Sequence, residues 1–163
     1  MTRTVVCRRL WRVLAALILA MLPAAASACI SCSCTTSASS LSFGTYDPVS
    51  ALPRDASALV SIDCNGLVAL LGVVEVRVGT GSSNNQLQRT MVQGDTGLNY
   101  NLYADIARTQ ILGDGTGGTT KATASLNGLL TFSTVVPVFG RIPAGQWVGS
   151  GTYADTVIIT VQY

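Results

Sequence analysis

Residues 151–163 read Gly-Thr-Tyr-Ala-Asp-Thr-Val-Ile-Ile-Thr-Val-Gln-Tyr and stand last in the sequence. From Thr156 onward this stretch is rich in β-branched residues and has no charge, a pattern typical of a buried strand. A buried strand needs a hydrogen-bonding neighbour along each edge, because unpaired N–H and C=O groups are costly away from water. We expect one neighbour from within the domain and the other from a different polypeptide, so this stretch indicates assembly rather than catalysis.

The predicted terminal strand would form the open edge of the fold. Its residues are Thr156, Val157, Ile158, Ile159, Thr160, Val161, Gln162 and Tyr163. Because side chains alternate between the two faces of a strand, either Val157, Ile159 and Val161 or the residues of the opposite face would line a groove beside it. A strand from another chain would lie in that groove.

The sequence begins with the features of an export signal. An apolar run covers residues 13–22 and small residues follow at 24–28, as at a cleavage site, while the basic residues ahead of them are Arg3, Arg8, Arg9 and Arg12. The apolar run is shorter than the about 20 residues that span a bilayer. We therefore predict a cleaved signal peptide over residues 1–28 and an exported domain over residues 29–163, with lipidation of Cys29 as the alternative.

The charge of the predicted exported domain differs from that of the whole sequence. Removing 28 of the 163 residues leaves 135, which suits one domain, and takes away four of the ten basic residues. Six basic against eight acidic residues then give a net charge of −2. This balance provides no basic face for nucleic acid, and we expect neither nucleic acid nor a small-molecule substrate as a partner.

Short apolar segments separated by turn residues indicate an all-β fold. Asn65-Gly66 and Asn127-Gly128 are expected to form tight turns between neighbouring strands. In residues 67–78, alternation places three valines on a buried face opposite Glu75 and Arg77. The spacing predicts a β-sandwich of about seven strands, drawn from the segments 41–46, 58–64, 67–78, 87–91, 98–103, 119–126, 129–139 and the terminal stretch.

The predicted exported domain contains four cysteines: Cys29, Cys32, Cys34 and Cys64. An even number in an exported chain indicates disulfides rather than zinc ligands. Cys32 and Cys34 are too close to bond easily, so Cys64 is expected to pair with a member of the first cluster. A Cys34–Cys64 bond would close a loop of about 30 residues and stabilise the fold by roughly 3–4 kcal/mol, and Cys29 and Cys32 would then form a second pair.

The composition excludes several kinds of catalytic site. The sequence contains no histidine, which rules out Ser-His-Asp, Cys-His and histidine–metal sites, and its carboxylates are scattered. Residues 113–118 lack the lysine and the helix of a phosphate-binding loop. Asp105 and Asp114 are too few for calcium. We therefore predict no enzymatic activity, no cofactor and no metal site.

A few polar and aromatic residues invite a functional interpretation. Arg89, Arg141 and Asp155 are expected as structural partners at the ends of sheets. Trp147 lies in a predicted loop, where an exposed indole would suit contact with a hydrophobic surface. We expect it instead to pack beneath that loop.

Several motifs together resemble the spore coat protein U domain, the fold of the Csu-type (archaic chaperone–usher) pilins. Their order and spacing extend over essentially the whole predicted exported domain. The motifs are Cys34-Thr35-Thr36 and the stretches 41–48, 60–64, 89–91, 98–105, 113–115, 138–146 and 151–157.

This resemblance implies an incomplete immunoglobulin-like β-sandwich that lacks its last strand. A periplasmic chaperone would lend a strand to the subunit, and at an outer-membrane usher the N-terminal extension of a sibling pilin subunit would replace it. The resulting fibres on the cell surface serve attachment and biofilm formation. The resemblance also implies a disulfide between Cys34 and Cys64.

The N-terminus departs from the pattern of a fibre-forming pilin. After the predicted cleavage only residues 29–33 precede Cys34, and at about 3.3 Å per residue they are too short to lie along a partner's groove. The chain is therefore expected to accept a strand without donating one, at the tip of a fibre or outside a fibre, as in a spore coat. The alternative is a self-complete secreted binding module or tip adhesin that contacts surfaces.

Overall fold

The computed structural model describes residues 33–163, apart from the side chains of residues 67–72 and 127–129. The predicted signal peptide, Cys29 and Cys32 lie outside this part of the chain. The fold is all-β, as predicted, and no helix in the described residues is long and apolar enough to span a membrane. Its elements are β1 (Ser33–Ala38), β2 (Arg54–Val78), the 3-10 helix η1 (Gly81–Ser83), β3 (Arg89–Gln93), β4 (Thr96–Tyr103), β5 (Ala122–Ile142) and β6 (Ile159–Gln162).

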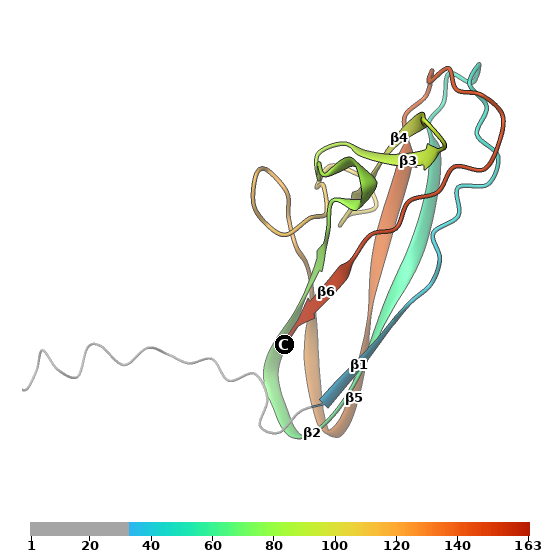
Figure 1. The fold of residues 1–163 in the computed structure, drawn as a ribbon. Coiled ribbons are helices and arrows are strands. Elements are labelled where there is room, and N and C mark those ends of the chain that lie inside the picture. The colour runs from blue at the N-terminus through green and yellow to red at the C-terminus, as the bar shows by residue number, and fades with distance from the viewer. Residues whose placement is uncertain (1–32) are drawn as a thin grey trace, which may run out of the picture.

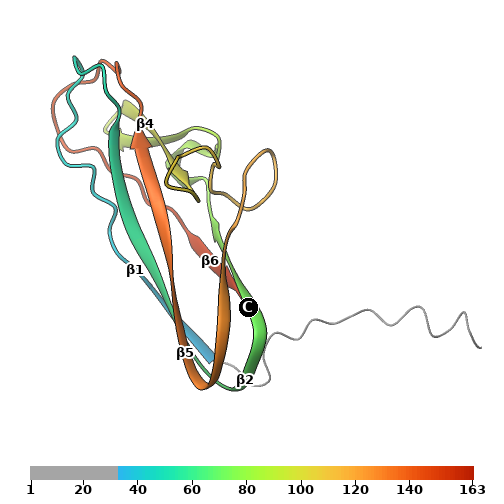
Figure 2. The same ribbon diagram turned by 180° about the vertical axis from the view of Figure 1, so that it is seen from behind.

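The centre of the fold is a long bent hairpin made by β2 and β5. The two strands are antiparallel and pair from Arg54 with Ile142 to Val76 with Ala122. Their register shifts between Gly66 and Gly72, and both strands fold back near this point, so that each contributes to two facing layers (Figures 1 and 2). Bulges bend a strand and increase its twist, which accounts for the position of the bend.

The two Asn-Gly pairs do not form the tight turns that we predicted. Gly66 pairs with Leu130 and Ala69 pairs with Gly128, so each strand continues through its Asn-Gly pair. Both pairs lie in the bend of the hairpin, where Leu130 has a φ of 74°. Residues that tolerate unusual backbone angles thus form one shared bend. Where the sequence predicted four strands, two on each side of the two Asn-Gly pairs, the structure has two continuous strands, β2 and β5.

The other strands flank this hairpin. The order across the sheet is β1-β2-β5-β4-β3, and β6 pairs with β2. On β2, Cys64 in the first half lies opposite Cys34 of β1, whereas Val78 at the far end lies opposite Ile159 of β6. β1 and β6 therefore share one edge of β2, one strand in each layer. The terminal strand is shorter than predicted, since residues 156–158 precede β6 without joining its ladder.

The segment 41–46 is not a strand, contrary to the prediction, and the first strand is β1 instead. The Phe43 carbonyl accepts a hydrogen bond from the side chain of Arg54, through Nε at 2.7 Å, rather than from the backbone of a neighbouring strand. Leu41 and Phe43 pack onto Gly140 of β5, where a Cβ atom would lie 2.8 Å from the Phe43 ring. The alternation in this segment therefore reflects packing over a glycine and not pairing in a ladder.

One apolar core lies between the two layers. Val74, Val76 and Val78 are buried, as the alternation predicted, and Glu75 pairs with Arg77 at 2.9 Å on the outer face. In the layer that contains the start of β2, Arg141 donates two hydrogen bonds to Asp55 on the outer face, at 2.7 and 2.8 Å. Arg108 Nη1 lies 3.3 Å from Asp55 Oδ2. The hydrogen bond from Arg141 holds the pKa of Asp55 below its usual value.

A disulfide joins β1 to β2 through Cys34 and Cys64, 30 residues apart in sequence. The two cysteines lie directly opposite each other in the antiparallel pair. Because β1 is short and exposed, this bond is its firmest attachment to the rest of the fold.

We expect the double substitution Cys34→Ala/Cys64→Ala to lower the free energy of unfolding by about 3–4 kcal/mol, because the bond restricts the unfolded chain. Urea unfolding followed by far-ultraviolet circular dichroism measures this change. The wild-type chain after reduction is the matched control and should lose a similar amount. An unchanged unfolding midpoint in the double variant would contradict this expectation.

Candidate functional site

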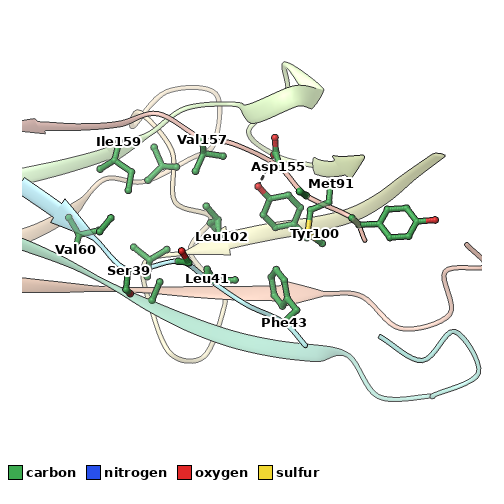
Figure 3. Close-up of a pocket in the computed structure, with 17 residues that line it drawn as sticks. Ser39, Leu41, Phe43, Val60, Met91, Tyr100, Leu102, Asp155, Val157 and Ile159 are labelled. Carbon is green, nitrogen blue, oxygen red and sulfur yellow. Dashed lines mark hydrogen bonds between the residues drawn. The ribbon is translucent and has the colours of Figure 1, made fainter. Parts of the chain in front are cut away.

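An open groove separates the two strands that share the edge of β2. Two adjoining depressions, with volumes of about 350 and 590 Å³, form this edge groove. Its N-terminal wall lies within residues 38–48 and its C-terminal wall within residues 148–159. The depressions meet at four residues that line both of them, Leu41, Phe43, Met91 and Tyr153. Figure 3 shows the smaller depression.

The floor of the edge groove is the apolar core itself. Val60 of β2 and Leu102 of β4 line the smaller depression, together with Val157 and Ile159 of the C-terminal segment (Figure 3). Beside them the rings of Phe43 and Tyr100 pack edge to face with their centres 5.9 Å apart. Apolar side chains thus line a channel along the edge of the sandwich, and a strand laid over them would remove them from water.

The strand that leads into the N-terminal wall, β1, has side chains that face the core but are exposed to solvent. In β1, Thr36 lies opposite Ile62 and Ala38 lies opposite Val60, so each pair shares one face of the sheet. Ile62 and Val60 are buried, yet Thr36 and Ala38 are exposed. Among the described residues, β1 pairs with β2 alone. Ala38, the last residue of β1, lines the groove.

The C-terminal wall presents one face to the groove and the other to solvent. Val157, Ile159 and Val161 pack against the core, whereas Ile158 is 75% exposed. Gly79 N–H donates to the Ile158 carbonyl at 2.8 Å, so by alternation the backbone groups of Ile158 and Thr160 point toward β2. The N–H and C=O groups of Val157, Ile159 and Val161 then point away from β2, along the open edge.

The predicted edge residues are thus divided between two environments. Val157 and Ile159 line the groove, and Val161 belongs to the same row of side chains. Thr156, Ile158, Thr160 and Gln162 are exposed on the opposite face, and Tyr163 is 50% exposed at the end of the chain. Of the two faces that the sequence left open, the one that carries Val157 faces the groove.

Asp155 is the one charged residue that lines the groove in the described part of the chain. Its carboxylate accepts the Tyr100 hydroxyl at 2.7 Å (Figure 3). Burial, with a further contribution from Asp155, raises the pKa of Tyr100. The sequence suggested a structural role for Asp155, but its partners come from segments distant in sequence and were not predictable.

Arg89 is fully buried beside this pair. Its guanidinium donates to the carbonyls of Gly79 and Leu112, at 2.8 and 2.9 Å, and to Asn101 Oδ1 at 2.7 Å. Burial lowers the pKa of Arg89, and the nearby Tyr100 and Asp155 oppose that effect. Arg89 was expected at the end of a sheet. It is the first residue of β3, and its side chain joins that strand to β4 and to the loops that follow β2 and β4.

The other residues singled out in the sequence have local roles. Asp105 accepts hydrogen bonds from Thr109 and Gln110 within one loop, and Asp114 accepts from Thr116 within another. The described residues contain no group of three His, Cys, Asp or Glu side chains placed to hold a metal ion.

Trp147 does not pack beneath its loop, contrary to the expectation, and is 80% exposed. The loops 44–53 and 143–152 lie together at the pole opposite the bend of the β2–β5 hairpin (Figure 1). The Tyr46 hydroxyl joins them, because it accepts from Gln146 N–H at 2.8 Å and donates to the Pro143 carbonyl at 3.1 Å.

The structure is an all-β sandwich with an apolar groove along one edge. Comparison with known proteins shows that the chain belongs to the Spore Coat Protein U domain family, which matches residues 20–160. This confirms the resemblance seen in the sequence. The chain is 35% identical to Protein U of Myxococcus xanthus, over 76% of this chain and 71% of that protein.

A solved structure shares the fold. It is a chain in the crystal structure of the CsuC–CsuE chaperone–tip adhesion subunit pre-assembly complex, from the archaic chaperone–usher Csu pili of Acinetobacter baumannii. The TM-score is 0.54 at 20% sequence identity, and the match covers 81% of this chain and 40% of that chain. The present chain thus spans two fifths of its length, and the likeness concerns the fold.

We expect Arg89→Met to lower the free energy of unfolding by at least about 3 kcal/mol, because several buried carbonyls would lose their hydrogen-bond donor. Arg77→Met is the matched control. Arg77 is partly exposed on the outer face of β2, and its loss should cost less than about 1 kcal/mol. Urea unfolding measures both. Equal losses in the two variants would contradict the role assigned to Arg89.

Proposed function

We propose that this chain is an exported structural subunit of a chaperone–usher fimbria or a related spore coat, assembled by accepting a β-strand from another polypeptide. The edge groove is the observation that carries the proposal. It combines an apolar floor with backbone N–H and C=O groups along the open edge of β6. These are the two features that bind an added strand, since main-chain hydrogen bonds supply affinity and alternate side-chain pockets supply specificity.

The chemistry of the groove defines the strand that fits it. Because Val157, Ile159 and Val161 alternate along the C-terminal wall, the strand needs apolar side chains at every second position. Burying one Val, Ile or Leu side chain contributes about 1.5–3 kcal/mol. A few such side chains then offset the entropy lost when the strand becomes ordered.

The proposed strand donors are a periplasmic chaperone during transit and a sibling pilin subunit afterwards, with an outer-membrane usher where they exchange. Membership of the Spore Coat Protein U domain family supports a pilin or coat subunit rather than an enzyme. The shared fold with a chain of a chaperone–subunit complex supports a chaperone partner. Export by the predicted signal peptide would bring the chain to the periplasm and then to the cell surface, where attachment and biofilm formation are the proposed roles.

Adding a strand peptide tests this proposal. A synthetic peptide of about ten residues, with valine at every second position and threonine between, should raise the melting temperature of the exported chain by several degrees. Ile159→Asp should abolish the rise, because it places a carboxylate in the groove. Ile158→Asp makes the same change on the exposed face and should leave the rise intact. A wild-type chain that does not respond would refute strand acceptance.

A second candidate function is contact with hydrophobic surfaces at the tip of a fibre. The exposed Trp147 favours it, together with Val49 and Leu52, which are 73% and 74% exposed in the neighbouring loop. Asp47 is the only charged residue in the two loops 44–53 and 143–152. Large apolar side chains in a charge-poor setting suit contact with an apolar surface.

Retention on a hydrophobic surface tests the second candidate. We expect Trp147→Ser to reduce retention of the exported chain on polystyrene beads severalfold, because an indole buries more apolar area than any other side chain at this pole. Ile106→Ser removes an apolar side chain that is 74% exposed in the loop between β4 and β5, and should have little effect. Equal retention of all three proteins would argue against surface contact at this pole.

A further inference from the structure

The C-terminal wall of the edge groove continues beyond the strand that anchors it. β6 pairs with β2 from Ile159 onward, and ahead of it Ala154 forms an isolated bridge with Val92. Between these points, residues 155–157 belong to no ladder in the described structure. Val157 nevertheless lines the groove. This part of the wall is therefore held by something other than a sheet.

The Asp155 carboxylate provides this attachment. Its Oδ2 accepts the Tyr100 hydroxyl at 2.7 Å (Figure 3). Its Oδ1 accepts the N–H and the hydroxyl of Ser82, at 2.9 and 2.6 Å, and the N–H of Thr156 at 2.8 Å. Tyr100 belongs to β4 and Ser82 to η1. One carboxylate thus ties the wall to two other elements.

The surroundings are shaped to receive this carboxylate. Gly81 has a φ of 66°, and a Cβ atom there would overlap Asp155 Oδ2. The guanidinium of the buried Arg89 also lies near Asp155, so that opposite charges adjoin at the end of the wall. Asp155 also lies in the same row of side chains as Val157 and Ile159, because every second residue of a strand-like segment faces the same side.

We propose that Asp155 is a positioning residue for the donated strand, which holds Val157 and Ile159 in place across the groove before the strand arrives. This inference rests on the proposed function and adds a determinant of affinity to it. The hydrogen bonds of Asp155 are all internal, so its effect on the strand is transmitted through the wall. A wall that is ordered in advance loses less conformational entropy on binding, and the strand therefore binds more tightly.

Affinity measurements on matched variants test this inference. Fluorescence anisotropy would give the dissociation constant of the labelled valine–threonine peptide for the exported chain. We expect Asp155→Asn and Tyr100→Phe each to weaken binding by about tenfold or more, because each loses a charge-assisted hydrogen bond. The double variant should be about as weak as the weaker single variant, since both changes break one shared bond.

Asp55→Asn is the control for general loss of stability. It breaks the bonds from Arg141 on the outer face, away from the groove, and should lower the unfolding midpoint without changing the dissociation constant. If Asp155→Asn does not fold, Tyr100→Phe decides the question alone, because it removes only a hydroxyl group.

The outcomes separate this inference from the proposed function. A wild-type chain that does not bind the peptide overturns both. A wild-type chain that binds, with Asp155→Asn or Tyr100→Phe binding as tightly, overturns only the inference. Equal weakening by Asp55→Asn also overturns it, because binding would then follow overall stability.

Discussion

The two edges of β2 have different neighbours, and the rest of the structure depends on this difference. One edge is paired with β5 from Arg54 to Val76, through the bend. The other edge is shared by β1, along residues 60–65 of β2, and by β6, along residues 75–78. Because the hairpin folds back between them, β1 and β6 lie in different layers (Figure 1). The apolar core reaches the surface between these two strands as the edge groove.

Much of the fold and the general position of the groove were predictable from local patterns. The alternation around Val76 correctly predicted a buried face, and the uncharged terminal stretch correctly predicted a strand. These signals depend on side-chain periodicity within a few residues, which survives in the folded structure. The family membership was predictable for a similar reason, since short motifs keep their order and spacing along the chain.

The features that the sequence did not predict all depend on contacts between distant segments. An Asn-Gly pair has the same local preference in a tight turn and in a bulge, and only the partner strand decides between them. Leu41 and Phe43 alternate like a strand but pack over Gly140, almost a hundred residues away. Asp155 is likewise bound by Ser82, which is 73 residues away in sequence. No local pattern contains these pairings.

Hydrogen exchange at single amides of β6, in residues 29–163 without any partner, tests most directly whether this edge is open. Thr160 and Gln162 should exchange slowly, because alternation directs their N–H groups to β2, whereas Ile159 and Val161 should exchange much faster. Fast exchange at Ile159 and Val161 beside protected neighbours is the result that the account predicts. Equal protection at all four amides would show that both sides of β6 are already paired, and would contradict it.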